Sequence, residues 1–97
     1  MKRVVVRRLA RADIDRASVY YESERRGLGL EFLEAVDRAI GQIAANPYQY
    51  PAAHREMRRM LLHPFPYGLF YKPQGDLVRV YAVIHTSRHP PHWQRRA

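Results

Sequence analysis

Apolar positions along the chain recur with two different periods. Three consecutive valines flanked by arginines predict a short strand over residues 2–9, covered on at least one face. Two stretches with helical spacing follow, at residues 12–25 and from residue 30 to about residue 45, with a break at Gly27-Leu28-Gly29. Asn46-Pro47 ends the second helix, because the residue before a proline avoids the helical region.

Each predicted helix carries an apolar stripe. In the first helix, Ile14, Ala17 and Tyr21 share one face, and Asp13 and Asp15 favour its N-terminal turn. The stripe of the second helix is wider and comprises Leu30, Leu33, Val36, Ile40 and Ile43, flanked by Phe32, Ala35 and Ala39. Two antiparallel helices joined by a glycine turn need a sheet to cover such stripes.

The second half of the chain supplies that sheet. Its pattern predicts strands near residues 55–62, 67–72 and 77–85, separated by turns at His63-Pro64 and Pro73-Gln74-Gly75-Asp76. The order is therefore β-α-α-β-β-β. We expect a single α+β domain over residues 1–97, with a helical hairpin packed on one face of a mostly antiparallel four-stranded sheet.

Strict alternation along the last strand sorts its side chains between the two faces. Val78, Val80, Ala82 and Ile84 are expected to face the helices, and Arg79, Tyr81, Val83 and His85 to share the open face. A regular hairpin would place Phe70 beside Arg79 on the open face. Arg58 and Arg59 are neighbours on one strand, so only one of them can join this group.

Composition excludes several classes of protein. The 97 residues include no cysteine, which rules out disulfides and thiolate metal sites. No apolar run is long enough to span a bilayer, and the three-residue apolar segment near the N-terminus is too short for a signal peptide. We therefore expect a soluble, cytoplasmic protein.

The positive charge is concentrated in one half of the sequence. Residues 1–45 hold nine Lys/Arg and seven Asp/Glu, a net +2, whereas residues 46–97 hold eight Lys/Arg and two Asp/Glu, a net +6. All five histidines also lie in the second half. Such a surface suits an anionic partner, either nucleic acid or an acidic protein segment.

Two C-terminal segments carry a family resemblance. They resemble the RelE/ParE superfamily of bacterial type II toxin–antitoxin toxins, on its ParE-like side. The first segment is His54…Arg58-Arg59…Leu62…Phe65-Pro66-Tyr67-Gly68-Leu69-Phe70-Tyr71, and the second is Val80-Tyr81-Ala82-Val83-Ile84-His85…Arg88-His89-Pro90…Trp93. The resemblance implies a growth-inhibiting toxin, neutralised in a hetero-oligomer by a cognate antitoxin. The antitoxin's flexible, often acidic C-terminal segment would wrap the toxin.

The superfamily contains two mechanisms. ParE-like members inhibit DNA gyrase and need no catalytic residue, whereas RelE-like members cleave mRNA on the ribosome with a general acid–base and cations for the phosphate. This sequence lacks the RelE-like lysine pair before the second strand, where His54 and Arg55 stand. It also has Trp93 where a tyrosine would follow the last strand. These departures favour gyrase as the target; mRNA cleavage is the alternative, and a non-toxic basic nucleic-acid-binding domain is a third.

The candidate target- or antitoxin-binding residues are Arg58, Arg59, Arg79, Tyr81, His85, Arg88 and Trp93. In a nuclease, His85 would be the acid or base, and Arg79, Arg88 and one of Arg58 and Arg59 the phosphate clamps.

Each candidate also has a purely structural interpretation. His85 can bond a neighbouring backbone group, Arg88 can pair with Glu31 or Glu34, and Trp93 can anchor the tail by packing. Tyr81 is the aromatic residue most expected to be exposed. No cofactor is expected, and the spacing of His85, His89 and His92 matches no structural zinc pattern, so no metal site is expected.

Overall fold

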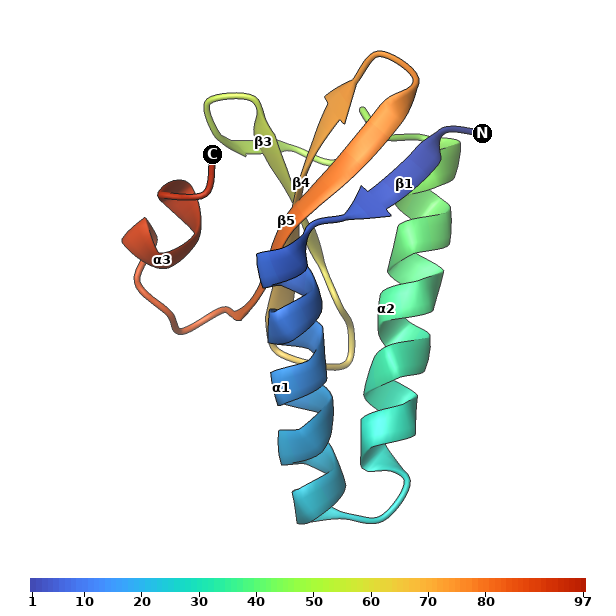
Figure 1. Cartoon of the computed structure of the whole chain (residues 1–97), viewed down its shortest axis with the longest axis vertical. Helices are drawn as coiled ribbons and strands as arrows, with labels where there is room; N and C mark the ends of the chain where they lie inside the picture. Colours follow the sequence, from blue (N-terminus) through green and yellow to red (C-terminus); the bar gives the residue numbers. More distant parts are fainter.

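A helical hairpin covers one face of a five-stranded sheet in the computed structural model, which describes all residues from 1 to 97 (Figure 1). The elements in chain order are β1 (Arg3–Val6), α1 (Arg8–Glu24), α2 (Leu28–Ala45), β2 (Ala52–His54), β3 (Met57–Leu61), β4 (Tyr67–Gln74), β5 (Leu77–His85) and α3 (Pro91–Gln94). The strand order is β1-β5-β4-β3-β2. Only β1 runs parallel to its neighbour, because the hairpin of helices carries the chain from β1 to the far side of the sheet.

Two sequence predictions about the strands are corrected. The sheet has five strands instead of four, because the loop after α2 contains the three-residue strand β2. The strand expected from residue 55 begins at Met57, since Arg55 adopts a left-handed backbone conformation (φ 54°) in the turn between β2 and β3. The predicted strand over 77–85 matches β5 at both ends.

The first helix begins four residues earlier than predicted, at Arg8. Arg7 precedes it without any side-chain cap, so the sequence carries no N-terminal signal there. Asp13 consequently lies in the second turn, where it is 4% exposed. It does not serve the first turn as the sequence suggested.

The two helices approach each other closely at their connection. Gly27 takes a left-handed conformation (φ 88°), and its N–H and that of Gly29 donate to the carboxylate of Glu22 on α1. Glu22 thereby supplies the cap that α2 lacks in its own sequence. A Cβ on Gly29 would lie 2.7 Å from the carbonyl oxygen of Ser18, so only glycine fits this contact.

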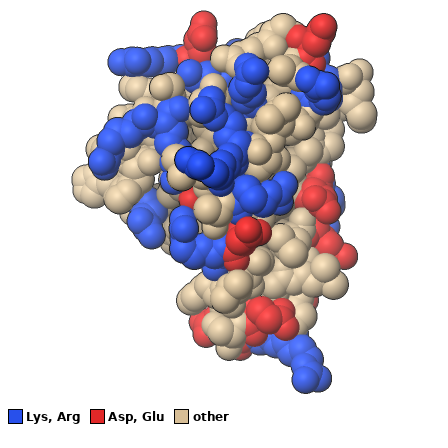
Figure 2. Space-filling model, in the orientation of Figure 1, with Lys and Arg blue, Asp and Glu red and all other residues tan.

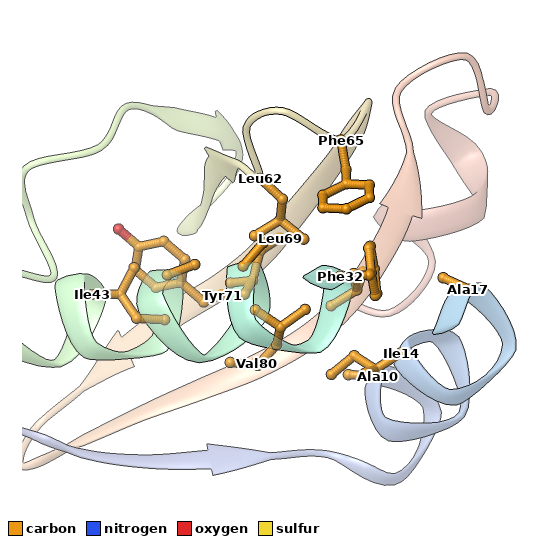
Figure 3. Packing of buried hydrophobic residues seen from close by; sticks show 14 of the residues in the cluster. Ala10, Ile14, Ala17, Phe32, Ile43, Leu62, Phe65, Leu69, Tyr71 and Val80 are labelled. Carbon is orange, nitrogen blue, oxygen red and sulfur yellow. The ribbon is translucent and has the colours of Figure 1, made fainter. Parts of the chain in front are cut away.

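The main core lies between the hairpin and the sheet (Figure 3). Edge-to-face and tilted contacts join Tyr21 and Phe32 on the helices to Phe65 and Tyr67 at the start of β4, with ring centroids 4.8–6.0 Å apart. The predicted stripe of α2 is correct for Val36 and Ile43 but wrong for Leu30, which is 61% exposed. Leu33 is also exposed, at 36%, and the buried face near the N-terminus of α2 is formed by Phe32 and Leu28 instead.

A second, smaller core occupies the opposite face of the sheet. It contains Met57, Phe70, Tyr81, Ala82, Ile84 and Trp93. The indole of Trp93 in α3 stacks on the Phe70 ring, with centroids 4.2 Å apart and planes at 18°. The short C-terminal helix, absent from the sequence prediction, therefore covers part of the face that was expected to be open.

Candidate target-binding surface

A β-bulge at Tyr81 determines which residues meet at the end of the sheet. Phe70 pairs with Ala82 whereas Tyr71 pairs with Val80, which leaves Tyr81 as an extra residue on β5. The bulge reverses the side-chain alternation along the rest of the strand. Val83 therefore packs in the core beneath the helices, and Ala82 and Ile84 pack on the other face beside Phe70.

The structure corrects several sequence predictions about β5, and the bulge accounts for the reversed faces of Ala82, Val83, Ile84 and His85. Ala82 and Ile84 do not face the helices, and Val83 does. His85 pairs with Tyr67 on the helix side, away from Arg79. Tyr81 is 8% exposed and so is not an open aromatic surface. Phe70 does lie on the face away from the helices, but its partner on β5 is Ala82, and Lys72 is opposite Arg79.

Asp13 and Arg96 bind the backbone groups that the bulge leaves free. The Val83 N–H donates to Oδ2 of Asp13 at 3.0 Å, and Arg96 Nη1 donates to the Tyr81 carbonyl at 3.1 Å and to Asp13 Oδ2 at 2.5 Å. Arg16 Nη2 donates to the other carboxylate oxygen, Asp13 Oδ1, at 2.8 Å. The buried Asp13 is thus fully paired, and it ties α1, β5 and the C-terminal tail together.

A cleft of about 190 Å³ opens between α1 and the end of β5. Its polar lining includes Arg16, Tyr20, Tyr67, His85, Arg88 and His92. Burial raises the pKa of Tyr67 above its ordinary value of 10.0, while the nearby guanidinium groups of Arg88 and Arg16 act in the opposite direction. The cleft therefore presents cations and imidazoles beside a neutral phenol.

His85 forms local hydrogen bonds at the rim of this cleft. Its Nδ1 accepts the Ser87 backbone N–H at 3.0 Å and lies 2.8 Å from the Ser87 hydroxyl. The ring also meets Tyr67 edge-on, with centroids 5.3 Å apart. Because Nδ1 accepts a backbone proton, the neutral tautomer that makes this bond carries its proton on Nε2. This is the backbone-bonded arrangement that the sequence allowed for His85.

Arg58 and Arg59 fall on opposite faces, as alternation predicted. Arg58 donates to the carbonyls of Tyr50 and Tyr48 at 2.5 Å and 3.4 Å, so it holds the loop before β2. Arg59 pairs with Phe70 and lines a smaller cleft, of about 90 Å³, with Arg88 and Trp93. Of the two, Arg59 alone joins the end of β5.

The remaining candidates are separated along the sheet. The Arg79 guanidinium donates to the Gln74 side chain near the β4–β5 turn. Six residues of strand at about 3.3 Å each put Arg79 roughly 20 Å from His85. Arg88 lines both clefts and forms no ion pair with Glu31 or Glu34, since Glu31 pairs with Arg25 instead. The site that the structure assembles is therefore His85, Arg88 and Arg59 around Trp93.

Sequence reasoning missed a second basic group, formed by the start of α1 and the end of the chain. Arg7, Arg8, Arg95 and Arg96 line an open cleft there together with Leu9 and Tyr81. Figure 2 shows Lys and Arg gathered over this side of the molecule, around α3 and the start of α1. Asp13 alone carries two of the three ion pairs in the structure, so most of the seventeen basic side chains are without a carboxylate partner.

The fold agrees with one solved toxin–antitoxin structure. A chain of the chromosomal ParDE toxin–antitoxin system from P. aeruginosa superimposes with a TM-score of 0.66 at 18% identity, over 88% of this chain and 96% of that one. Among curated proteins, none matches this sequence. At this identity the likeness establishes the fold alone, a helical hairpin on a mostly antiparallel sheet.

The family itself follows from the sequence match. Residues 4–90 match the family described as ParE toxin of the type II toxin–antitoxin system parDE, and the match includes both long helices, β2 to β5 and all of β1 except Arg3. The chain belongs to the ParE toxin family, as its C-terminal motifs indicated. No helix of the protein has the length and apolarity needed to cross a membrane.

Proposed function

We propose that this ParE-family toxin arrests growth by inhibiting DNA gyrase and is neutralised by a cognate antitoxin. The observation that carries the choice of target is the dispersal of the nuclease candidates. Arg58 is bound to loop carbonyls, Arg79 lies roughly 20 Å from His85 along the strand, and His85 Nδ1 is occupied by Ser87. A cleavage site needs its acid–base and phosphate clamps around one phosphate, whereas gyrase inhibition needs only a rigid binding surface.

The binding surface that we assign to the target comprises Arg59, His85 and Arg88, with the largely buried Trp93 (8% exposed) as the anchor beneath them. β3 and β5 position the first two, and the stack of Trp93 on Phe70 fixes the tail beside them. Rigid placement of a few cations and an aromatic residue is typical of hot-spot surfaces.

Antitoxin binding is supported by exposed apolar side chains on the helical hairpin. Val19 is 70% exposed, Tyr20 54% and Leu30 61%, and they lie on a protein whose net charge is +8. A flexible segment with apolar and acidic residues gains both burial and charge complementarity on such a surface. We therefore expect a toxin–antitoxin hetero-oligomer in the cytoplasm.

One observation favours a second candidate function, mRNA cleavage on the ribosome. The cleft between α1 and β5 gathers His85 and His92 with Arg16 and Arg88, which are groups able to move protons and bind phosphate. A ribosome-programmed mRNA cleavage assay tests it. Loss of cleavage in folded His85→Ala would establish catalysis, whereas absence of any cleavage product would exclude this function.

Expression in a bacterial host tests the class of activity. We expect growth arrest when the toxin is expressed alone and recovery when the antitoxin encoded beside it is co-expressed. A culture that grows normally while accumulating folded protein would contradict the assignment as an active toxin. Supercoiling by purified gyrase then tests the target directly.

A further inference from the structure

We propose that the cleft between the start of α1 and the C-terminal tail binds the phosphate backbone of duplex DNA. This arginine cleft is lined by Arg7, Arg8, Leu9, Tyr81, Arg95 and Arg96, and its open volume is about 590 Å³. None of its lining residues is acidic. It lies outside the surface assigned to gyrase and gives the toxin a contact with nucleic acid of its own.

Most of the arginines in the cleft have no carboxylate partner. Arg96 is neutralised by Asp13, but Arg7, Arg8 and Arg95 form no ion pair. All three side chains are exposed. Arg95 Nε donates to the Pro91 carbonyl at 3.0 Å and Arg7 lies over the Tyr81 ring, but the terminal nitrogens of the three guanidinium groups have no hydrogen-bond partner and can contact phosphate oxygens. The cleft therefore has three uncompensated cations around one concavity.

The position of these cations is unfavourable for the isolated protein. Arg7 and Arg8 stand at the N-terminus of a seventeen-residue helix that has no acidic residue in its first turn and no side-chain cap. Cations there oppose the helix dipole, whose positive end lies at the N-terminus. An anion in the cleft would relieve this repulsion, so binding and stability should be linked.

The lining favours a polyanion over an acidic peptide. Its two apolar residues are Leu9, which is 53% exposed, and Tyr81, which is buried, so the cleft offers a single accessible apolar side chain. A peptide that folds on binding must bury apolar surface to offset its loss of entropy. The exposed apolar side chains suited to that role lie elsewhere, at Val19, Tyr20 and Leu30 on the hairpin. Phosphate contacts require only the cations.

The aromatic groups favour a duplex over a single strand. Single-stranded nucleic acid is held by bases stacked on exposed aromatic rings. The Tyr81 ring is covered by the cations of Arg7 at 4.8 Å and Lys72 at 5.1 Å, and Trp93 is stacked on Phe70. In a duplex the bases stack on one another, so binding to its backbone requires phosphate contacts and no exposed aromatic ring. The arginines of this cleft can supply those contacts.

The test is fluorescence anisotropy of a labelled DNA duplex titrated with the full-length toxin, freed of antitoxin, over a series of salt concentrations. Three phosphate contacts predict a slope of log K against log salt of about −3. Arg8→Ala/Arg95→Ala removes two exposed cations without touching Asp13. It should reduce the slope to about −1 and weaken binding about tenfold or more at low salt.

Arg26→Ala/Arg38→Ala is the matched control, since it removes the same charge from exposed positions at the helical hairpin. It should leave the slope unchanged. Equal effects of the two double variants, or no duplex binding at low salt, would overturn the proposal. So would tighter binding of single-stranded RNA or of an acidic peptide at the same cleft. No gyrase is present, so failure here leaves the proposed target untouched.

Discussion

The carboxylate of Asp13 on the first helix accepts a hydrogen bond from the guanidinium of Arg96, 83 residues later in the chain, at 2.5 Å. The same carboxylate accepts the Val83 N–H, and Arg96 also donates to the Tyr81 carbonyl. One ion pair thus holds the bulge of β5 and the C-terminal tail together. The position of His85 and Trp93 depends on it.

Removing Asp13 should therefore destabilise the protein strongly. Asp13→Ala leaves the Val83 N–H without its partner and Arg96 without its carboxylate, so we expect a loss of about 3 kcal/mol in the free energy of unfolding. Urea unfolding measures it. Asp15→Ala, at an exposed position on the same helix, should change it by less than about 0.5 kcal/mol. Similar losses in Asp13→Ala and Asp15→Ala would mean that the ion pair is not the source of the stability lost in Asp13→Ala.

The two glycines of α2 should respond to alanine with opposite signs. Gly29→Ala places a Cβ 2.7 Å from the Ser18 carbonyl oxygen and should cost about 1–3 kcal/mol by forcing the helices apart. Gly41 has nothing within 4 Å of the added Cβ, so Gly41→Ala should stabilise the protein by about 0.5–1 kcal/mol. Thermal unfolding of the two variants gives the comparison. A stabilised Gly29→Ala would show that the hairpin is more open than described.

Trp93 provides both an anchor and a reporter for the tail. Trp93→Ala removes the stack on Phe70 and should cost about 3 kcal/mol, whereas Trp93→Phe keeps an aromatic contact and should cost less. Because Trp93 is the only tryptophan, its emission reports the tail directly. We expect an apolar, blue-shifted emission in the native protein. Emission typical of a solvated indole under native conditions would contradict the docked tail.

Stability should fall at high pH because of Tyr71. Burial raises the pKa of Tyr71 from its ordinary 10.0 to about 12, and its hydroxyl donates to the Pro47 carbonyl at 2.6 Å. A raised folded-state pKa means that this stabilisation is complete below pH 10 and is lost as the pH rises towards 12. The Tyr71→Phe variant should be less stable than the unmodified protein at neutral pH, but its free energy of unfolding should fall less between pH 10 and 12. If the free energy of unfolding falls equally with pH in the two proteins, Tyr71 is not the cause of the loss of stability.

The sequence predicted the order of the two long helices and of four of the five strands, and the limits of β5, because these depend on local patterns; it missed the short elements β2 and α3. The Asn46-Pro47 stop appears where it was expected. The glycine break and the last turn were placed correctly but made too long, because Leu28 and Gly29 belong to α2, and Pro73 and Gln74 belong to β4. The prediction failed at β5 because its bulge is stabilised by Asp13 and Arg96, which are distant in sequence. No alternation pattern contains that information.

The candidate site was predicted only in part, because some of its residues are positioned by contacts between distant parts of the sequence. The sequence could place Trp93 and one of Arg58 and Arg59 near the end of the sheet, but the choice of Arg59 came from the structure, and the side on which His85 falls depends on the bulge. The arginine cleft joins residues 7–9 to residues 95–96, and only the folded tail brings them together. No local pattern pointed to it, because the sequence placed Arg7 and Arg8 in the first strand and not at the start of a helix.

Gyrase supercoiling with the purified toxin, freed of its antitoxin, tests the central claim most directly. We expect inhibition that rises with toxin concentration, is reversed by the antitoxin and, in folded His85→Ala, is weakened but still reached at higher toxin concentration, because His85 is assigned a contact with the target and no catalytic role. Arg59→Ala/Arg88→Ala should weaken inhibition by about tenfold or more if each contact contributes about 1 kcal/mol. Full supercoiling at excess toxin would contradict gyrase as the target.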